Sequence, residues 1–113
     1  MKLSESSIQQ SCYVWFNNTY CLKHHTPRLL MCSIPNEGMG QKEQSRKKQV
    51  GLLAGASDTI IVIENRVIFC EFKDEKGRQS DKQIDFQQRV ESLNHEYWII
   101  RSLEEFKLKL ETL

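Results

Sequence analysis

The sequence Glu71-Phe72-Lys73 and the earlier Asp58 are the residues of this chain best suited to chemistry. The apolar run from Val67 to Lys73 predicts a β-strand, and side chains two residues apart on a strand point to the same face. The carboxylate of Glu71 and the ammonium of Lys73 would then lie side by side on an otherwise apolar element. Burying such groups costs several kcal/mol unless they are paired or bind a metal. Their position therefore favours a chemical role.

The position of Asp58 relative to this pair depends on the turn between two predicted strands. Residues 57–63 predict a second strand, and Glu64-Asn65-Arg66 separates it from the first. Asparagine tolerates the left-handed conformation of a tight turn. A loop of the first two turn residues sets Asp58 opposite Glu71, and a loop of the last two sets it opposite Lys73 and diagonal to Glu71. A three-residue loop would place it on the other face.

Two carboxylates on neighbouring strands can hold a hard divalent cation. Asp58 and Glu71 offer the oxygen ligands that Mg²⁺ prefers, and the backbone carbonyl of Phe72 is a candidate further ligand. The metal would polarise a phosphoryl oxygen and lower the pKa of a bound water. Lys73 could position or deprotonate that water, or neutralise charge in the transition state. The alternative is an aspartate at a strand start beside a surface ion pair.

Two further side chains are candidates for the same site, and each also has a structural explanation. Glu5 precedes the apolar stripe of a predicted helix and could be a third acid for the metal. It could equally complement the helix dipole, a contribution of about 0.3–1 kcal/mol. Gln83 could bind a phosphate, or hold Lys73 and the attacking water. It is also the fourth residue of a capping box that begins at Ser80.

Two groups of basic residues flank the proposed site and are candidate DNA contacts, because phosphate backbones are bound by local groups of cations. The groups are Lys42, Arg46, Lys47 and Lys48 before the strand pair, and Lys76, Arg78 and Lys82 after it. Acidic neighbours dilute both groups, and such runs are also typical of solvated helix faces. The net charge of the chain is +1, so any nucleic-acid binding would come from local patches.

The length and composition indicate a soluble globular protein. A chain of 113 residues predicts one domain over residues 1–113, and 39% apolar with 27% charged residues is ordinary for that class. No apolar run approaches the roughly 18 residues that span a bilayer, and no hydrophobic targeting segment begins the sequence. We therefore expect a cytoplasmic protein with no membrane partner and no organic cofactor.

The four cysteines are predicted to be reduced and mostly buried, because none forms a Cys-x-x-Cys pair. A structural zinc site is disfavoured. The step from Cys21 to His24 has usable ligand spacing, with His25 and Cys32 nearby, but no second closely spaced pair accompanies it.

The predicted element order is helix, strand, helix, hairpin, helix, strand, helix, which implies an α/β domain with a mixed sheet covered by helices. Besides the hairpin, the ranges are a helix over Ser4–Leu22, a strand over Arg28–Ile34, a polar helix over Gln41–Leu53, a helix from Ser80, a strand over Tyr97–Arg101 and a helix from Ser102. The predicted core faces are Ile8, Cys12, Trp15, Phe16 and Thr19, then Phe86, Val90 and Leu93, then Phe106 and Leu110.

Five short motifs follow one another along most of the chain. They are Ile34-Pro35-Asn36-Glu37-Gly38, Gly51 to Gly55 leading into Asp58, Glu71-Phe72-Lys73, Ser80-x-x-Gln83 with Phe86, and Tyr97-Trp98-Ile99-Ile100-Arg101-Ser102. In this order and spacing they resemble the VRR-NUC family, the virus-type replication-repair nuclease branch of the PD-(D/E)xK nucleases. The resemblance extends from Glu5 to about Phe106.

The resemblance implies a restriction-endonuclease-like fold and hydrolysis of phosphodiester bonds with Mg²⁺ or Mn²⁺. By position, Glu5 matches the family's N-terminal acid and Asp58 matches its metal-binding aspartate. Glu71 and Lys73 match its E-x-K pair, and Gln83 matches its helix glutamine. Ser57 replaces the usual proline before the aspartate, which puts the local turn chemistry in doubt and keeps both metal ligands.

The family also includes homodimers that cut branched DNA such as four-way junctions, domains with flap activity, and stand-alone phage or prophage proteins. The resemblance thus implies a structure-selective DNA endonuclease of phage or prophage origin that acts in the host cytoplasm. A homodimer is also favoured because a small domain gains buried surface and a two-fold enzyme could cut two strands. The alternative is a non-catalytic nucleic-acid-binding or assembly module with the same fold.

Overall fold

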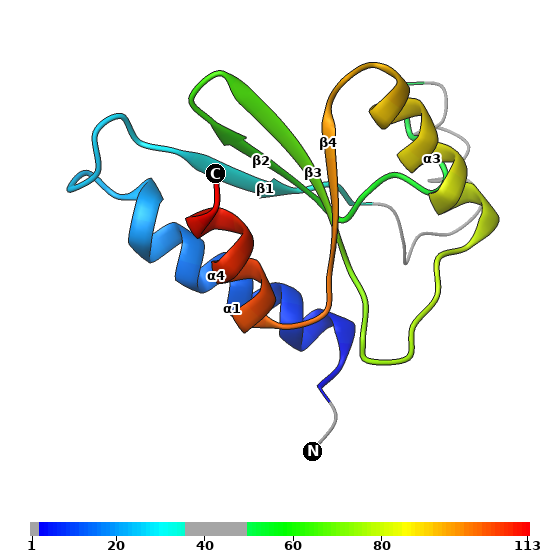
Figure 1. The fold of residues 1–113 in the computed structure, drawn as a ribbon, viewed down its shortest axis with the longest axis horizontal. Helices are drawn as coiled ribbons and strands as arrows, with labels where there is room; N and C mark the ends of the chain where they lie inside the picture. Colours follow the sequence, from blue (N-terminus) through cyan, green and yellow to red (C-terminus); the bar gives the residue numbers. More distant parts are fainter. Residues whose placement is uncertain (1–2, 36–49) are drawn as a thin grey trace.

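In the part of the chain that the structure describes, the protein is built on a four-stranded mixed β-sheet with helices on both faces (Figure 1). The computed structural model describes residues 3–35 and 50–113. The elements are α1 (Glu5–Phe16), a π-helical turn (Asn17–Cys21), β1 (Leu30–Ser33), β2 (Thr59–Ile63), β3 (Arg66–Phe72), α3 (Asp81–Ser92), β4 (Glu96–Ile100) and α4 (Leu103–Glu111). The predicted α/β class is confirmed.

The strands lie in the order β1-β2-β3-β4. The pairs β1–β2 and β2–β3 are antiparallel, whereas β3 and β4 are parallel and are connected through α3. A parallel pair requires a crossover connection, and α3 supplies it. In Figure 1, α1 and α4 lie together on one side of the sheet and α3 lies on the other side.

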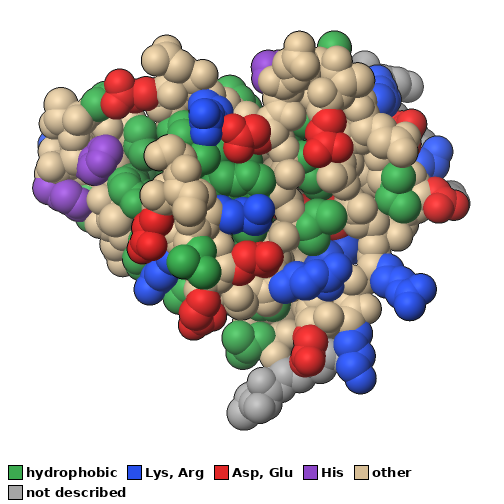
Figure 2. Space-filling model, in the orientation of Figure 1, with side chains coloured by type: hydrophobic (Ala, Val, Ile, Leu, Met, Phe, Trp, Pro, Cys, Tyr) green, Lys and Arg blue, Asp and Glu red, His purple; other side chains and the backbone are tan. Residues whose placement is uncertain are grey.

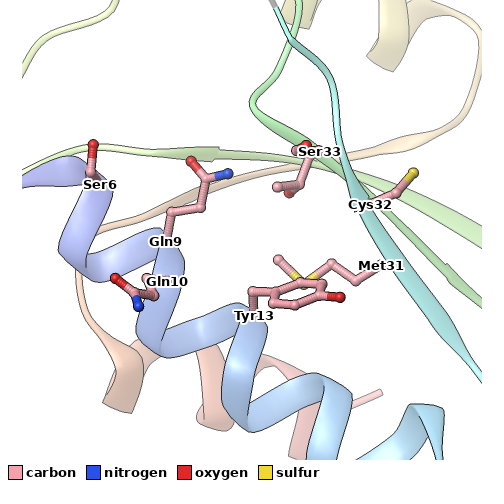
Figure 3. A pocket seen from close by; sticks show the side chains of 8 residues that line it. Ser6, Gln9, Gln10, Tyr13, Met31, Cys32 and Ser33 are labelled. Carbon is pink, nitrogen blue, oxygen red and sulfur yellow. The ribbon is translucent and has the colours of Figure 1, made fainter.

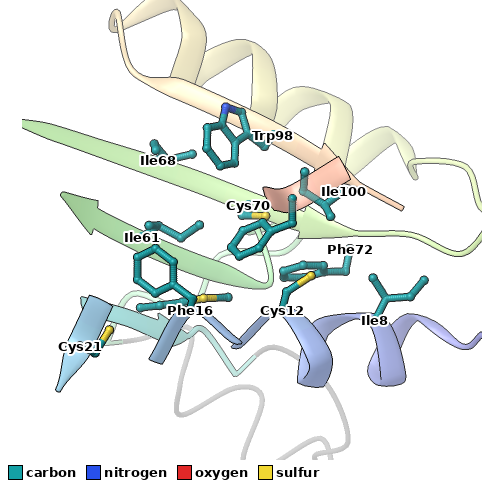
Figure 4. Packing of buried hydrophobic residues seen from close by; sticks show 12 residues of the cluster. Ile8, Cys12, Phe16, Cys21, Ile61, Ile68, Cys70, Phe72, Trp98 and Ile100 are labelled. Atoms are coloured by element: carbon teal, nitrogen blue, oxygen red, sulfur yellow. The ribbon is translucent and has the colours of Figure 1, made fainter. Parts of the chain in front are cut away.

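One face of the sheet forms the main core with α1 and α4. Thr59 lies opposite Cys70, and Cys70 lies beside Trp98 on the parallel strand, so these side chains share that face. Figure 4 shows the residues of α1 packed onto the apolar residues of this face. The cluster includes Ile8, Cys12, Phe16, Ile61, Ile68, Cys70, Phe72, Trp98, Ile100 and Phe106.

The first helix follows its predicted pattern and then changes geometry. Ser4 is its N-cap and accepts a hydrogen bond from the Ser7 amide. The predicted stripe is buried at Ile8, Cys12 and Phe16, while the predicted core positions 15 and 19 are half-buried. The helix was predicted to continue to Leu22, but Asn17–Cys21 form a π-helical turn instead of α-helix.

The helices α3 and α4 begin where the sequence predicted. Ser80 caps α3 with the complete capping box, and Ser102 caps α4 by accepting from the Glu105 amide. On α3, Val90 is buried and Phe86 is half-buried, but the prediction for Leu93 was wrong, because Leu93 is 69% exposed. Since α3 ends at position 92, Leu93 is the C-cap and leaves the helical face.

The predicted helix over Gln41–Leu53 is only partly comparable with the structure. Residues 41–49 lie outside the described ranges. Residues 50–53 form a turn followed by irregular backbone rather than helix, so the prediction was wrong there. Gly51 has a φ of +108°, which a right-handed helix does not contain.

The described cysteines are all free, with Cys12, Cys21 and Cys70 buried and Cys32 exposed. This agrees with the prediction of mostly buried thiols. Within the described ranges, the helices are too short and too polar for any of them to cross a bilayer.

Candidate functional site

The hairpin between β2 and β3 decides where Asp58 lies. Ile63 pairs with Arg66, so the loop consists of Glu64 and Asn65, and Asn65 has the left-handed φ of +61°. The first of the two-residue loops considered from the sequence is therefore correct. Because position 59 pairs with position 70, the same register continued by one residue sets Asp58 beside Glu71.

The carboxylate of Asp58 is held against β3 by a main-chain hydrogen bond. Its Oδ2 accepts from the backbone N–H of Phe72 at 2.7 Å. Burial raises the pKa of Asp58 above the ordinary value of 3.8. The Phe72 N–H opposes this rise, Glu71 adds to it, Lys73 opposes it and Glu5 adds to it. The site thus concentrates negative charge on a partly desolvated acid.

Glu71 is fully buried, and its two carboxylate oxygens have different surroundings. The register puts its side chain on the sheet face that α3 covers. Oε1 accepts from the Tyr97 hydroxyl at 2.5 Å and from Gln79 Nε2 at 3.0 Å. Oε2 lies 3.4 Å from the ammonium nitrogen of Lys73 and has no hydrogen-bond partner among the described residues. A buried oxygen left this way is rare in a purely structural carboxylate.

Lys73 is held between Glu71 and the first turn of α3. It is 7% exposed, its Nζ donates to Gln83 Oε1 at 2.9 Å, and its backbone N–H donates to the Ile100 carbonyl. Gln83 Oε1 also accepts from the Ser80 amide at 2.9 Å in the capping box. Gln83 therefore caps the helix and holds the lysine at once, as the sequence allowed.

Glu5 borders this pair from the beginning of α1. Glu5 and Lys73 both lie next to Gly77. A Cβ added to Gly77 would be 3.0 Å from Oε2 of Glu5 and 3.3 Å from Cδ of Lys73. Glu5 is also exposed in the first helical turn, so its interaction with the helix dipole holds as well. The roles of the Glu5 carboxylate and of the Phe72 carbonyl as metal ligands stay predictions.

Across residues 3–35 and 50–113, no three His, Cys, Asp or Glu side chains are already gathered in a metal-binding cluster. The arrangement is instead two acids and a lysine, in which one buried carboxylate oxygen receives no hydrogen bond from these residues and has the lysine ammonium beside it. Such an oxygen suits a hard cation. The histidines of the disfavoured zinc set are engaged locally, His24 with the Thr19 carbonyl and His25 with the Pro27 carbonyl.

Sequence reasoning missed Tyr97 and Gln79, which both contact Glu71. Tyr97 shares its face because Phe69 pairs with Tyr97 and Glu71 with Ile99 on the parallel neighbour. Gln79 also donates to Gln87 on α3 at 2.9 Å. An alternation pattern in β4 could have suggested Tyr97, whereas no local signal marks Gln79.

The second predicted group of basic residues lies near the site. Lys76, Arg78 and Lys82 are exposed on the loop after β3 and on the first turn of α3. In Figure 2, several Lys and Arg side chains gather at the lower right, over the part of the molecule where this loop lies in Figure 1. The first predicted group, Lys42, Arg46, Lys47 and Lys48, lies outside the described residues.

A separate groove of about 580 Å³ lies between α1 and β1 (Figure 3). Its lining consists of Ser6, Gln9, Gln10, Tyr13, Met31, Cys32, Ser33 and Thr59. Thr59 points to the same face as Cys70, and Glu71 points to the opposite face. The groove therefore lies on the opposite face of the sheet from the side chains of Glu71 and Lys73.

The four-stranded mixed sheet, its hairpin and its crossover helix define an α/β fold of the restriction-endonuclease-like kind. A solved structure described as a "VRR_NUC domain protein" matches 96% of this chain and 87% of its own, with a TM-score of 0.76 and 18% sequence identity. The chain thus has the fold of a VRR-NUC domain, as the motifs predicted. No protein-family model matches the sequence, and no curated protein matches it.

Proposed function

We propose that this chain is a metal-dependent nuclease that hydrolyses phosphodiester bonds in DNA. The observation that carries the proposal is the buried carboxylate of Glu71, whose Oε2 receives no hydrogen bond from the described residues and forms an ion pair with the Lys73 ammonium at 3.4 Å. The similarity to a VRR-NUC domain in fold supports it. Exposed basic residues beside the site suit a phosphate backbone.

Each side chain of the site has a role in this proposal. Asp58 and Glu71 would hold Mg²⁺ or Mn²⁺, with the Phe72 carbonyl and Glu5 as further ligands. The bound metal would polarise a phosphoryl oxygen and lower the pKa of a water. Lys73 orients the attacking water and neutralises charge on the phosphate, and Gln83 holds Lys73 in place.

The substrate that we propose is branched DNA, such as a four-way junction or a flap, in phage or prophage replication, recombination or repair. A homodimer would present two such sites and could cut two strands. In this assignment residues 1–113 act as one nuclease domain, and the basic residues on the loop after β3 contact the DNA backbone.

The test is cleavage of linear, flap and four-way-junction DNA with Mg²⁺ or with EDTA. We expect Mg²⁺-dependent cleavage that Asp58→Asn, Glu71→Gln and Lys73→Ala abolish while each variant stays folded. Glu64→Gln is the matched control, because this exposed acid lies in the turn of the same hairpin, away from the site. Salt-dependent binding without any cleavage would support the non-catalytic alternative and overturn the proposal.

A further inference from the structure

The carboxylate of Glu71 accepts hydrogen bonds from described residues on one oxygen only, and its other oxygen, Oε2, is ion-paired with the Lys73 ammonium at 3.4 Å. Both hydrogen bonds reach Oε1, from the hydroxyl of Tyr97 and from the amide of Gln79. Oε2 receives none within the described part of the chain. Two donors on one oxygen fix the rotation of the carboxylate, because turning it would break both bonds.

The two donors are themselves held in place by different elements. Tyr97 is buried in β4, and its ring packs on that of Phe86 at 6.2 Å between centroids. The amide of Gln79 donates to Gln87 on α3 at 2.9 Å as well as to the glutamate. Gln83, in the first turn of the same helix, accepts a hydrogen bond from the Lys73 ammonium. Helix α3 and strand β4 together therefore set the orientation of both charged groups.

We infer that Tyr97 and Gln79 are positioning residues that make Glu71 bind a divalent ion through Oε2 alone. The inference rests on the proposed function, since it concerns the same metal. Outer hydrogen-bond partners of this kind fix the orientation of metal-ligating side chains. Oε1 already accepts from two donors, so a bidentate contact would require it to give up at least one of these hydrogen bonds, of which the bond from Tyr97 is buried.

One-oxygen binding has a consequence for metal preference. Mg²⁺ demands near-octahedral geometry with few protein oxygens, whereas Ca²⁺ accepts six to eight oxygens and takes bidentate carboxylates readily. A carboxylate whose Oε1 is held by two hydrogen bonds offers only Oε2 to a metal, and this one-oxygen contact suits the smaller ion, Mg²⁺. Freeing Oε1 should therefore weaken Mg²⁺ binding more than Ca²⁺ binding.

The test is Tyr97→Phe, which removes the hydroxyl and keeps the ring packed on α3, together with Gln79→Ala. Titration calorimetry and thermal unfolding with Mg²⁺ and with Ca²⁺ measure binding without reference to cleavage. We expect the dissociation constant for Mg²⁺ to rise by about 10- to 100-fold, and the constant for Ca²⁺ to rise less. Tyr13→Phe is the control, because it removes an exposed tyrosine hydroxyl on α1.

Two results would overturn the inference. Wild-type Mg²⁺ affinity in both variants would show that Oε1 need not be held. Equal losses for Mg²⁺ and Ca²⁺ would show a general structural effect rather than a fixed carboxylate. If the wild-type protein itself showed no response to Mg²⁺, the proposed function would fail together with the inference.

Discussion

Replacing Gly55 by alanine probes how tightly the backbone before β2 packs against α3. Gly55 has a φ of +83°, and an added Cβ would lie 2.3 Å from the carbonyl carbon and oxygen of Lys82 and 2.8 Å from the Gln83 nitrogen. All three atoms belong to the first turn of α3, so they can give way only if the helix moves. Because Gln83 holds Lys73, that movement would reach the site.

The expected loss of stability has two parts. A left-handed conformation costs an alanine about 1–2 kcal/mol, and forcing extra volume against packed atoms typically costs about 1–3 kcal/mol. The sum for Gly55→Ala is roughly 2–5 kcal/mol, against the about 5–15 kcal/mol that stabilises a typical protein. At about 4 °C per kcal/mol for a chain of this length, Tm should fall by about 8–20 °C.

Gly51→Ala is the matched control. Gly51 has a φ of +108°, but a Cβ there would meet nothing within 4 Å. Only the backbone part of the cost remains, so its Tm should fall by about 4–8 °C. Thermal unfolding of both variants in EDTA measures the difference, and any nuclease activity should fall further in Gly55→Ala. Equal Tm losses would refute the close packing of Gly55 on α3.

Three further predictions test the core, the thiols and the acid of the site. Phe106 is fully buried against four aromatic rings, so Phe106→Ala should lower the free energy of unfolding by about 3–5 kcal/mol; a loss below about 1 kcal/mol in a denaturant titration would contradict this packing. Cys32 alone among the four cysteines is exposed, and burial raises the pKa of Cys12 to about 12, so a thiol reagent should label one cysteine in the native protein and four after unfolding. Labelling of Cys12 at the rate of Cys32 would contradict the packing of α1. Burial raises the pKa of Asp58, so the folded protein without metal loses stability as pH rises from the ordinary aspartate value through the raised one. Asp58→Asn should therefore melt above wild type in EDTA at neutral pH and below it in saturating Mg²⁺; the same order of Tm values in both conditions would argue against this site.

Local rules in the sequence were sufficient for much of the framework. The stripe of Ile8, Cys12 and Phe16 on α1, the capping box of α3 and the hairpin at Asn65 each depend on residues a few positions apart. Helical and strand periodicities and capping chemistry act over that range, so the sequence shows them directly. The pairing of Glu71 with Lys73 on one face followed from the same two-residue period.

Other features were decided only by the tertiary structure. The choice between the possible turns needed the register of β2 on β3, and the exposure of Leu93 needed the true end of α3. The partners of Glu71 Oε1 are 8 and 26 residues away in the chain, and the crossover through α3 brings them together. Periodicity gives the face on which a side chain lies, but long-range packing decides which side chains meet there and which buried oxygen receives no hydrogen bond from the described residues.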